Sequence, residues 1–188
     1  MASPLSQAQI QALPVTSVPL KTGDLFFCAG TSAESRIIED FTRSPWSHCG
    51  VVWVTAEVGH VLFLEAVDRY GVRLTPASKY LTAVNGELYD GPVLFARSST
   101  VTPAGTKAMI QFGCDQLTDP YSTREIIRIG ARIALGIGRA KPEDGWICSE
   151  LAAACLRSAG HVVATEYGYV TPADLWSDVA VSLLGRAA

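Results

Sequence analysis

The chain has 188 residues, of which 48% are hydrophobic and 18% are charged, and its formal net charge is −3. This length is enough for one domain with a sizeable core. The weak negative charge argues against a nucleic-acid-binding protein, which would carry a basic face, and no apolar run approaches the roughly 20 residues that span a bilayer.

Residues 1–20 are rich in Ser, Gln, Pro and Ala, and we interpret them as a tail or lead-in to a single domain over residues 21–188. They show neither the positive start nor the continuous apolar stretch of a standard secretory signal. The five cysteines are an odd number without regular spacing, which favours reduced thiols over a disulfide framework. We therefore expect a cytoplasmic protein, unless a signal has been removed from the natural N-terminus.

The first half of the chain is predicted to consist mainly of strands. A turn at residues 21–24 leads into a short apolar strand at 25–28, and a helix is predicted over 32–42 from Ile37, Ile38 and Phe41 at helical spacing. Further strands are expected at 48–54, 61–67, near 70–74 and at 92–97. Residues 55–60 are polar and contain Gly59, which is typical of a hairpin loop.

The second half is predicted to be helical. Thr102 and Pro103 form an N-cap and a first helical proline, so a helix should run to about Leu117. Residues 123–138 form a second predicted helix with a broad apolar face. A third runs from Cys148 to about residue 159, ahead of Gly160, and a last one follows residues 171–172. Early strands and late helices indicate the α+β class, with one antiparallel sheet.

A histidine, a glutamate and a cysteine stand at positions that suit one kind of chemistry. His48 begins a predicted strand, Glu65 lies inside the next strand, and Cys148 begins a predicted helix. A thiol nucleophile, an imidazole base and a group that orients the imidazole are the three parts of thiol-based acyl transfer. We therefore predict that His48, Glu65 and Cys148 are catalytic.

The hairpin predicts that His48 and Glu65 share a face of the sheet. If residues 55–60 are the whole loop, Val54 lies opposite Val61. By the same register His48 lies opposite Val67, which shares its face with Glu65 because strand side chains alternate. A slip of one residue in the register would separate the two side chains. A glutamate in an apolar strand costs several kcal/mol to bury unless it is paired, and an imidazole N–H is a natural partner.

The predicted place of Cys148 favours its reactive form. A helix N-terminus and a nearby imidazolium both stabilise a thiolate. The backbone N–H of Cys148 could also donate to the oxyanion of a tetrahedral intermediate. Cys155 follows two helical turns later on the same face, and we expect it to be a buried core residue beneath Cys148.

Each catalytic candidate also has a plain structural interpretation. A lone cysteine is often a small core residue, and His48 could be a satisfied core or hairpin residue. Glu65 could instead pair with Arg69 or Arg73 on an exposed face of the sheet. His60 and His161 are expected to be solvated, because the first lies in a loop and the second follows a helix end.

A zinc site is a further alternative. His48, Cys49, Cys148 and Cys28 would supply its ligands, but they have neither CxxC nor HxxxH spacing. We therefore expect no metal.

Five short segments resemble one known family when they are taken in order. They are GDLF at 23–26, SHCGVV at 47–52, LEA at 64–66, CSEL at 148–151 and VTPADL at 170–175. Over about 22–178 the chain resembles the circularly permuted branch of the NlpC-like papain-fold superfamily, and within it the YiiX-like group. In this branch the sheet precedes the nucleophile-bearing helix, so the order His, Glu, Cys is the reverse of the usual papain order.

The resemblance implies a permuted papain-like fold with Cys148 as nucleophile, His48 as base and Glu65 as orienter. It also places two substrate contacts. Tyr121 stands where relatives often have Tyr-Asp, although here Ser122 follows, and Trp46 precedes the histidine segment. Thiol-based hydrolysis of this kind needs no organic cofactor or metal. Murein-active relatives are usually exported, so the missing signal argues against murein.

The sequence is thus interpreted as a cysteine hydrolase, of the cysteine peptidase or amidase type, that cleaves an amide bond through an acyl-enzyme. Its substrate is expected to be a peptide, a murein fragment or a lipid amide. One alternative is a lipid acyl hydrolase or acyltransferase with the same triad, since arginines interleave the apolar segment 126–137 and could touch a membrane surface. A core helix with its basic residues in water is the favoured interpretation of that segment. The other alternative is a catalytically silent binding module.

Overall fold

The computed structural model describes residues 19–30, 33–81, 91–122, 145–163, 169–178 and 181–186. These residues form six strands and five helices. In chain order they are β1 (Leu25–Cys28), α2 (Ala33–Thr42), β2 (His48–Val54), β3 (Val61–Val67), β4 (Gly71–Pro76), α3 (Ser78–Leu81), β5 (Val93–Ser98), α4 (Pro103–Asp115), α6 (Cys148–Ser158), α7 (Pro172–Ser177) and β6 (Val181–Arg186).

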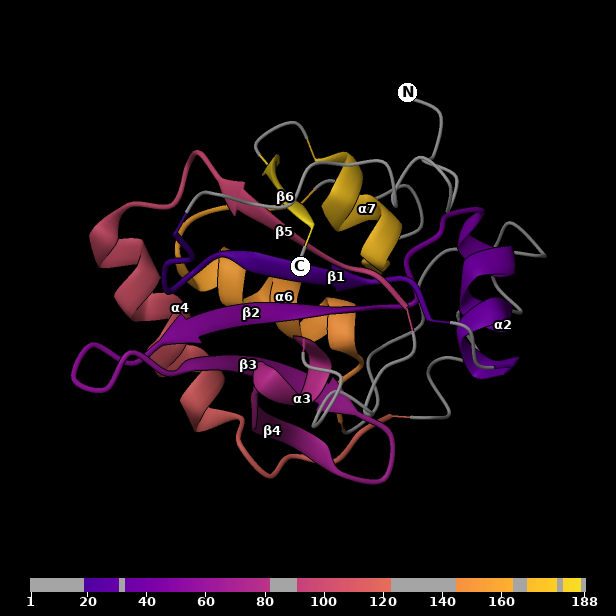
Figure 1. The fold of residues 1–188 in the computed structure, drawn as a ribbon, viewed down its shortest axis with the longest axis horizontal. Helices are drawn as coiled ribbons and strands as arrows, with labels where there is room; N and C mark the ends of the chain where they lie inside the picture. The colour runs from indigo at the N-terminus through magenta and orange to yellow at the C-terminus, as the bar shows by residue number, and fades with distance from the viewer. Residues whose placement is uncertain are drawn as a thin grey trace.

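The strands form one antiparallel sheet in the order β4-β3-β2-β1-β5-β6. Residues of β1 are buried along its whole length, because the strand lies inside the sheet with packed side chains on both faces. Figure 1 shows α6 crossing behind β1 and β2, while α3 lies in front of β3 and β4. The α+β class predicted from the sequence is confirmed.

Two apolar clusters lie on opposite faces of this sheet. The larger one joins the sheet to α4, α6 and α7, and the smaller one joins it to α3. Alternation along β1 divides its side chains between them, with Phe27 in the larger cluster and Phe26 in the smaller. The larger cluster holds the helix that begins at Cys148, so packing of α6 against β2 and β3 fixes where that residue lies.

Gly50 allows the middle of the sheet to close tightly. A Cβ at this position would meet the backbone carbonyl of Leu64 and the ring of Phe26 at distances that real side chains do not tolerate. A larger residue in the middle of β2 would therefore push β3 or Phe26 away. This close approach keeps β3 beside β2, which is the strand pair that carries Glu65 and His48.

Helix ends follow the capping residues that the sequence shows. Thr102 accepts a hydrogen bond from the backbone N–H of Gly105 at the start of α4, and Thr171 and Asp174 form a capping box at the start of α7. The structure ends α4 at Asp115, slightly before the predicted Leu117. Two elements were not predicted, namely the four-residue helix α3 and the edge strand β6.

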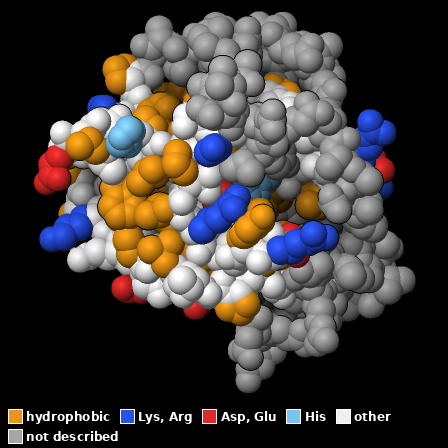
Figure 2. Space-filling model, turned by 60° about the horizontal axis from the view of Figure 1, so that its bottom comes forward, with side chains coloured by type: hydrophobic (Ala, Val, Ile, Leu, Met, Phe, Trp, Pro, Cys, Tyr) orange, Lys and Arg blue, Asp and Glu red, His pale blue; other side chains and the backbone are white. Residues whose placement is uncertain are grey.

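The predicted lead-in at 1–20 and the predicted helix at 123–138 lie largely or wholly outside the described residues, and with them the suggested membrane contact. No helix in the described ranges is both long enough and apolar enough to cross a membrane. Figure 2 shows one face on which hydrophobic side chains lie next to Lys and Arg side chains. The large hydrophobic side chains most exposed in these ranges are Val58, Tyr70 and Val162, which come from separate segments.

Candidate active site

His48 and Glu65 are joined by a buried hydrogen bond. The register of β2 and β3 places Val54 opposite Val61, as the length of the hairpin loop predicts. On the face shared by the two side chains, His48 Nε2 lies 2.8 Å from Glu65 Oε2. The predicted sharing of one face is therefore confirmed.

The Glu65 carboxylate is fully buried, with 0% of its surface exposed, and four side chains donate to it. Oε2 accepts from His48 and, at 2.5 Å, from the hydroxyl of Tyr80. Oε1 accepts from the hydroxyl of Thr75 at 2.6 Å and from Nε of Arg73 at 3.0 Å. Every lone-pair direction of the carboxylate thus has a donor, which meets the requirement for burying a charge.

These donors keep Glu65 ionised. Burial acts to raise the pKa of Glu65, but the hydrogen bond and charge of His48 and the hydroxyls of Thr75 and Tyr80 outweigh it and lower the pKa to about 2. A permanent negative charge therefore faces the imidazole. Among the structural alternatives for Glu65, pairing with Arg73 does occur, but inside the protein, while Arg69 lies at the surface beside Asp68.

Aromatic side chains hold the His48 ring in place. The ring of Phe26 meets it edge-on at 5.7 Å, and the ring of Tyr80 lies parallel to it at 6.5 Å. Nε2 is bound to Glu65, and the ring is also hydrogen-bonded to Cys148, for which Nδ1 is the remaining ring nitrogen. One nitrogen is thus held by a carboxylate while the other is available to the thiol, which is the division of roles that a general base needs.

Cys148 is the first residue of α6, and only 5% of it is exposed. Hydrogen bonds from the thiol of Cys49 and from His48, the charge of His48 and a backbone hydrogen bond from Cys49 lower the pKa of Cys148 well below its usual range, against the effect of burial. Burial would lower the pKa of His48, but its contacts with Cys148 and Glu65 raise it to about 10. Both shifts favour the thiolate of Cys148 and the imidazolium of His48.

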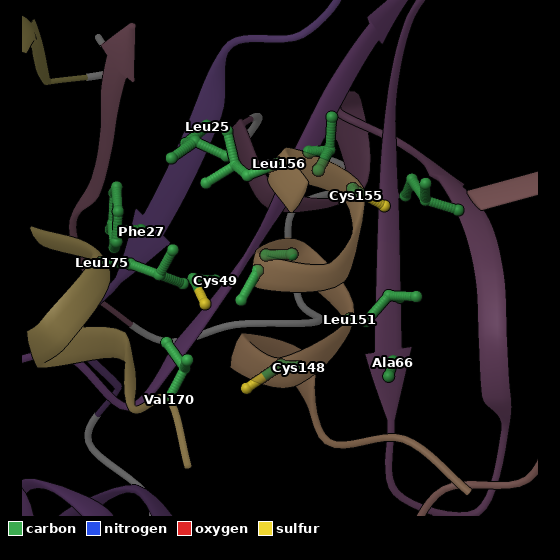
Figure 3. Packing of buried hydrophobic residues seen from close by; sticks show 14 of the residues in the cluster. Leu25, Phe27, Cys49, Ala66, Cys148, Leu151, Cys155, Leu156, Val170 and Leu175 are labelled. Carbon is green, nitrogen blue, oxygen red and sulfur yellow. The ribbon is translucent and has the colours of Figure 1, made fainter. Parts of the chain in front are cut away.

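The other cysteines have the opposite character, and all of them lie in described segments. Burial raises the pKa of Cys28, Cys49, Cys114 and Cys155, to about 12 for Cys155. Cys155 is fully buried two turns along α6, as predicted, and Figure 3 shows it near the far end of the helix from Cys148. Of the five thiols, that of Cys148 is thus set apart by its lowered pKa.

Backbone contacts fix the start of α6. Residues 120–122 run alongside 145–147, where the N–H of Ser122 donates to the carbonyl of Trp146 and the N–H of Trp146 donates to the carbonyl of Pro120, both at 3.0 Å. On the other side, the hydroxyl of Ser149 donates to the carbonyl of Val170 at 2.7 Å. The residues on both sides of Cys148 are therefore tied to neighbouring segments, which positions its side chain.

The two predicted substrate contacts lie in different environments. Tyr121 forms a parallel bridge with Trp146, two residues before Cys148, and is partly exposed. Trp46 is fully buried and packs against Phe27 and Trp176. This position does not agree with direct substrate contact by Trp46, whose role in the structure is core packing.

The two remaining histidines also differ from one another. His60 is exposed in the hairpin loop, as expected. His161 was expected to be solvated, but it is only 9% exposed. Its Nδ1 lies 2.7 Å from the hydroxyl of Thr100 and its Nε2 lies 3.3 Å from a carboxylate oxygen of Asp178. It links segments of the chain away from the triad.

Of the side chains that surround Glu65 besides His48, only Arg73 was named from the sequence, as a partner on an exposed face, and Thr75 and Tyr80 were missed. Arg73 lies directly opposite Glu65 in the β3–β4 pair, and Thr75 follows two residues later on the same face. The tight turn before Gly71 is the signal that could have placed both, because it sets the register of this hairpin. Tyr80 belongs to the unpredicted α3, and no periodic pattern points to it.

Comparisons with known proteins show the fold. The chain is similar to the crystal structure of the metalloprotein YiiX from Escherichia coli O157:H7, with a TM-score of 0.63 and 20% sequence identity. The match covers 87% of this chain and 95% of that one. The predicted likeness to YiiX is therefore confirmed at the level of the fold. No family model matches the sequence, and no curated protein matches it significantly.

YiiX is called a metalloprotein, and the side chains of this chain show whether they could hold a metal in the same way. Across the described ranges, no group of three or more His, Cys, Asp or Glu side chains is arranged to hold a metal ion. His48 Nε2 and Glu65 Oε2, which would be natural ligands, are already bound to each other. In this arrangement, His48 and Glu65 do not fit a metal centre.

Proposed function

We propose that this protein is a cysteine hydrolase that cleaves an amide bond through a thioester acyl-enzyme, on a circularly permuted papain-like fold. The observation that carries the proposal is the continuous buried contact from Cys148 through His48 to Glu65. It joins a nucleophile at a helix N-terminus, a base and a charged orienter, each in the role its chemistry suits. Strands β1 to β5 come before α6 in the chain, which is the element order expected of a permuted papain-like fold and supports that part of the proposal.

In the acylation step, the thiolate of Cys148 attacks the carbonyl carbon of the substrate and forms a C–S bond. The backbone N–H of Cys148, at the first position of α6, is free of intrahelical bonding by its place in the helix and is suited to bind the oxyanion. His48 then gives its proton to the leaving nitrogen as the C–N bond breaks. A thioester on Cys148, a neutral His48 and a free amine result.

In the deacylation step, neutral His48 removes a proton from water, and the hydroxide attacks the thioester carbonyl. The C–S bond breaks, the acid product leaves, and the thiolate and imidazolium are restored. Glu65 does not exchange protons in either step, because its pKa of about 2 keeps it ionised. It stabilises the imidazolium and fixes the direction of the ring.

A substrate panel tests this proposal and separates it from the alternatives. We expect purified protein to hydrolyse at least one member of a set of peptide amides, isopeptides, murein peptides and N-acyl lipids, and expect Cys148→Ala to abolish that hydrolysis. Cys155→Ala is the matched control, because it removes a buried thiol of the same helix and should retain turnover. Turnover of lipid substrates alone would favour the lipid hydrolase, and acyl transfer to an added amine or alcohol would favour an acyltransferase. An intact Cys148→Ala rate on every substrate would refute the proposed nucleophile.

A further inference from the structure

We propose that Tyr80 is a positioning residue of this site, whose hydroxyl shares Glu65 Oε2 with His48 and so limits how strongly that oxygen holds the imidazolium proton. The inference rests on the proposed function, because it concerns the proton that His48 must give to the leaving group. Tyr80 belongs to α3, on the side of the sheet away from α6.

The geometry shows one oxygen with two donors. Tyr80 Oη lies 2.5 Å from Glu65 Oε2, and His48 Nε2 lies 2.8 Å from the same atom. The other oxygen, Oε1, is bound by Thr75 and Arg73. The two oxygens therefore have separate tasks. Oε1 anchors the carboxylate to β4, while Oε2 divides its negative charge between the ring of His48 and the hydroxyl of Tyr80.

This division has a chemical consequence for catalysis. A carboxylate oxygen that accepts a second short hydrogen bond is a weaker acceptor for the first, because its charge is partly neutralised. His48 must hold a proton in the resting ion pair and yet give it up when the amine leaves. A buried, unshared carboxylate would hold the imidazolium too firmly. Tyr80 moderates that hold without removing the charge that orients the ring.

The titratable and charged groups around this oxygen and the His48 ring come from five elements besides β3. They are His48 of β2, Cys28 of β1, Arg73 of β4, Tyr80 of α3 and, beyond the ring, Cys148 of α6. Burial and the charge of Glu65 raise the pKa of Tyr80 far above its ordinary value, so its hydroxyl stays protonated and donates. The pKa of Cys28 is raised as well, which keeps its thiol neutral.

The test is a pH titration of the His48 ring by nuclear magnetic resonance in protein labelled at histidine. The chain has three histidines, so His48→Gln assigns the signal. Tyr80→Phe removes only the hydroxyl, and we expect the pKa of His48 to rise by about half a pH unit to one unit, because Glu65 Oε2 no longer shares its charge. Tyr70→Phe is the matched control. Tyr70 is exposed and its ring lies against Arg73, so this variant should titrate like the wild type.

A second variant keeps the phenol ring at position 80 and should shift the pKa of His48 in the opposite direction. Replacement of Tyr80 by 3,5-difluorotyrosine makes the phenol a stronger donor, and the pKa of His48 should then fall. This variant also serves if Tyr80→Phe does not fold. An unchanged pKa of His48 in a folded variant of either kind, or a shift of the opposite sign, would overturn the inference. Because the titration needs no substrate, its outcome is independent of whether the protein proves to be a hydrolase.

Discussion

His48 Nε2 and Glu65 Oε2 lie 2.8 Å apart, although the two residues are 17 positions apart in the chain and belong to different strands, β2 and β3. The β2–β3 hairpin brings them together, and the same ring is hydrogen-bonded to Cys148. This bond is one of several that favour the ionised groups. Cys49 and His48 lower the pKa of Cys148, Cys148 and Glu65 raise that of His48, and Thr75 and Tyr80 join His48 in lowering that of Glu65.

The thiol of Cys148 should be the first of the five to react with iodoacetamide. Its pKa is lowered while those of the other four thiols are raised, so at a given pH Cys148 has the largest thiolate fraction. Mass spectrometry after brief exposure should show Cys148 labelled ahead of Cys114, which is partly exposed but has a raised pKa. His48→Gln should slow the labelling of Cys148 at pH 6. Preferential labelling of Cys114 would be inconsistent with the ion pair.

Cys49→Ala should raise the pKa of Cys148. The hydrogen bond from the Cys49 thiol is the largest cause of the lowered value, and the variant removes it while retaining the backbone N–H. In a plot of the Cys148 alkylation rate against pH, we expect the midpoint of the rise to move up by about one pH unit in Cys49→Ala. In Cys49→Ser we expect a smaller move, because the serine hydroxyl can donate a hydrogen bond in place of the thiol. Cys155→Ala is the control, because it removes another thiol from the same apolar cluster. It should leave the midpoint unchanged, because Cys155 lies two helical turns away from Cys148. The same midpoint in Cys49→Ala and Cys155→Ala would show that the Cys49 thiol contributes packing only.

Glu65→Gln should lower the turnover of an amide substrate by about 10-fold to 1000-fold, which is one to a few kcal/mol of transition-state stabilisation. The amide oxygen can still accept from the imidazole, so the geometry is partly retained while the charge is lost. Glu65→Ala should be worse, because it leaves a cavity beside Tyr80 and Thr75 and frees the ring. Single-turnover kinetics would measure both losses. A full acylation rate in Glu65→Ala would mean that Glu65 serves only the fold.

Protein stability should depend on pH through the His48–Glu65 pair. The folded pKa of Glu65 is about 2, below the ordinary 4.5, so its stabilisation is present above pH 4.5 and is lost as the pH falls through 2. The folded pKa of His48 is about 10, above the ordinary 6.5, so its stabilisation is present below pH 6.5 and is lost as the pH rises through 10. The contribution of the pair is therefore greatest between pH 4.5 and 6.5.

Urea unfolding at several pH values would measure this dependence. The difference in unfolding free energy between the wild type and Glu65→Gln should be largest in that window, on the order of a few kcal/mol, and should shrink toward both extremes. Other acidic residues contribute equally to both proteins and cancel in the difference. A difference that stays constant from pH 3 to pH 10 would contradict the assigned ionisation states.

Local patterns in the sequence predicted the part of the site that a single hairpin builds. Alternation along β2 and β3 and the length of their loop were enough to place His48 beside Glu65. Capping residues likewise marked the starts of α4 and α7. These features depend on neighbours in the chain, so they can be recognised without the rest of the fold.

The missed features depend on contacts between distant segments. Trp46 lies in a loop, where no periodicity sets the direction of a side chain, and its packing against Trp176 becomes visible only in the folded chain. His161 is buried through Thr100 and Asp178, which come from two other segments. The helix of Tyr80 has four residues, too few for a helical pattern to appear.

The most direct test of the central claim is the capture of the acyl-enzyme. The protein would be mixed with an activated acyl substrate from the class that it hydrolyses, quenched in acid and analysed by intact and peptide mass spectrometry. We expect a mass increase of one acyl group on Cys148, absent in Cys148→Ala, present in Cys155→Ala and slower to form in His48→Gln. Turnover without any acylated Cys148, or an acyl group carried by another residue, would contradict it.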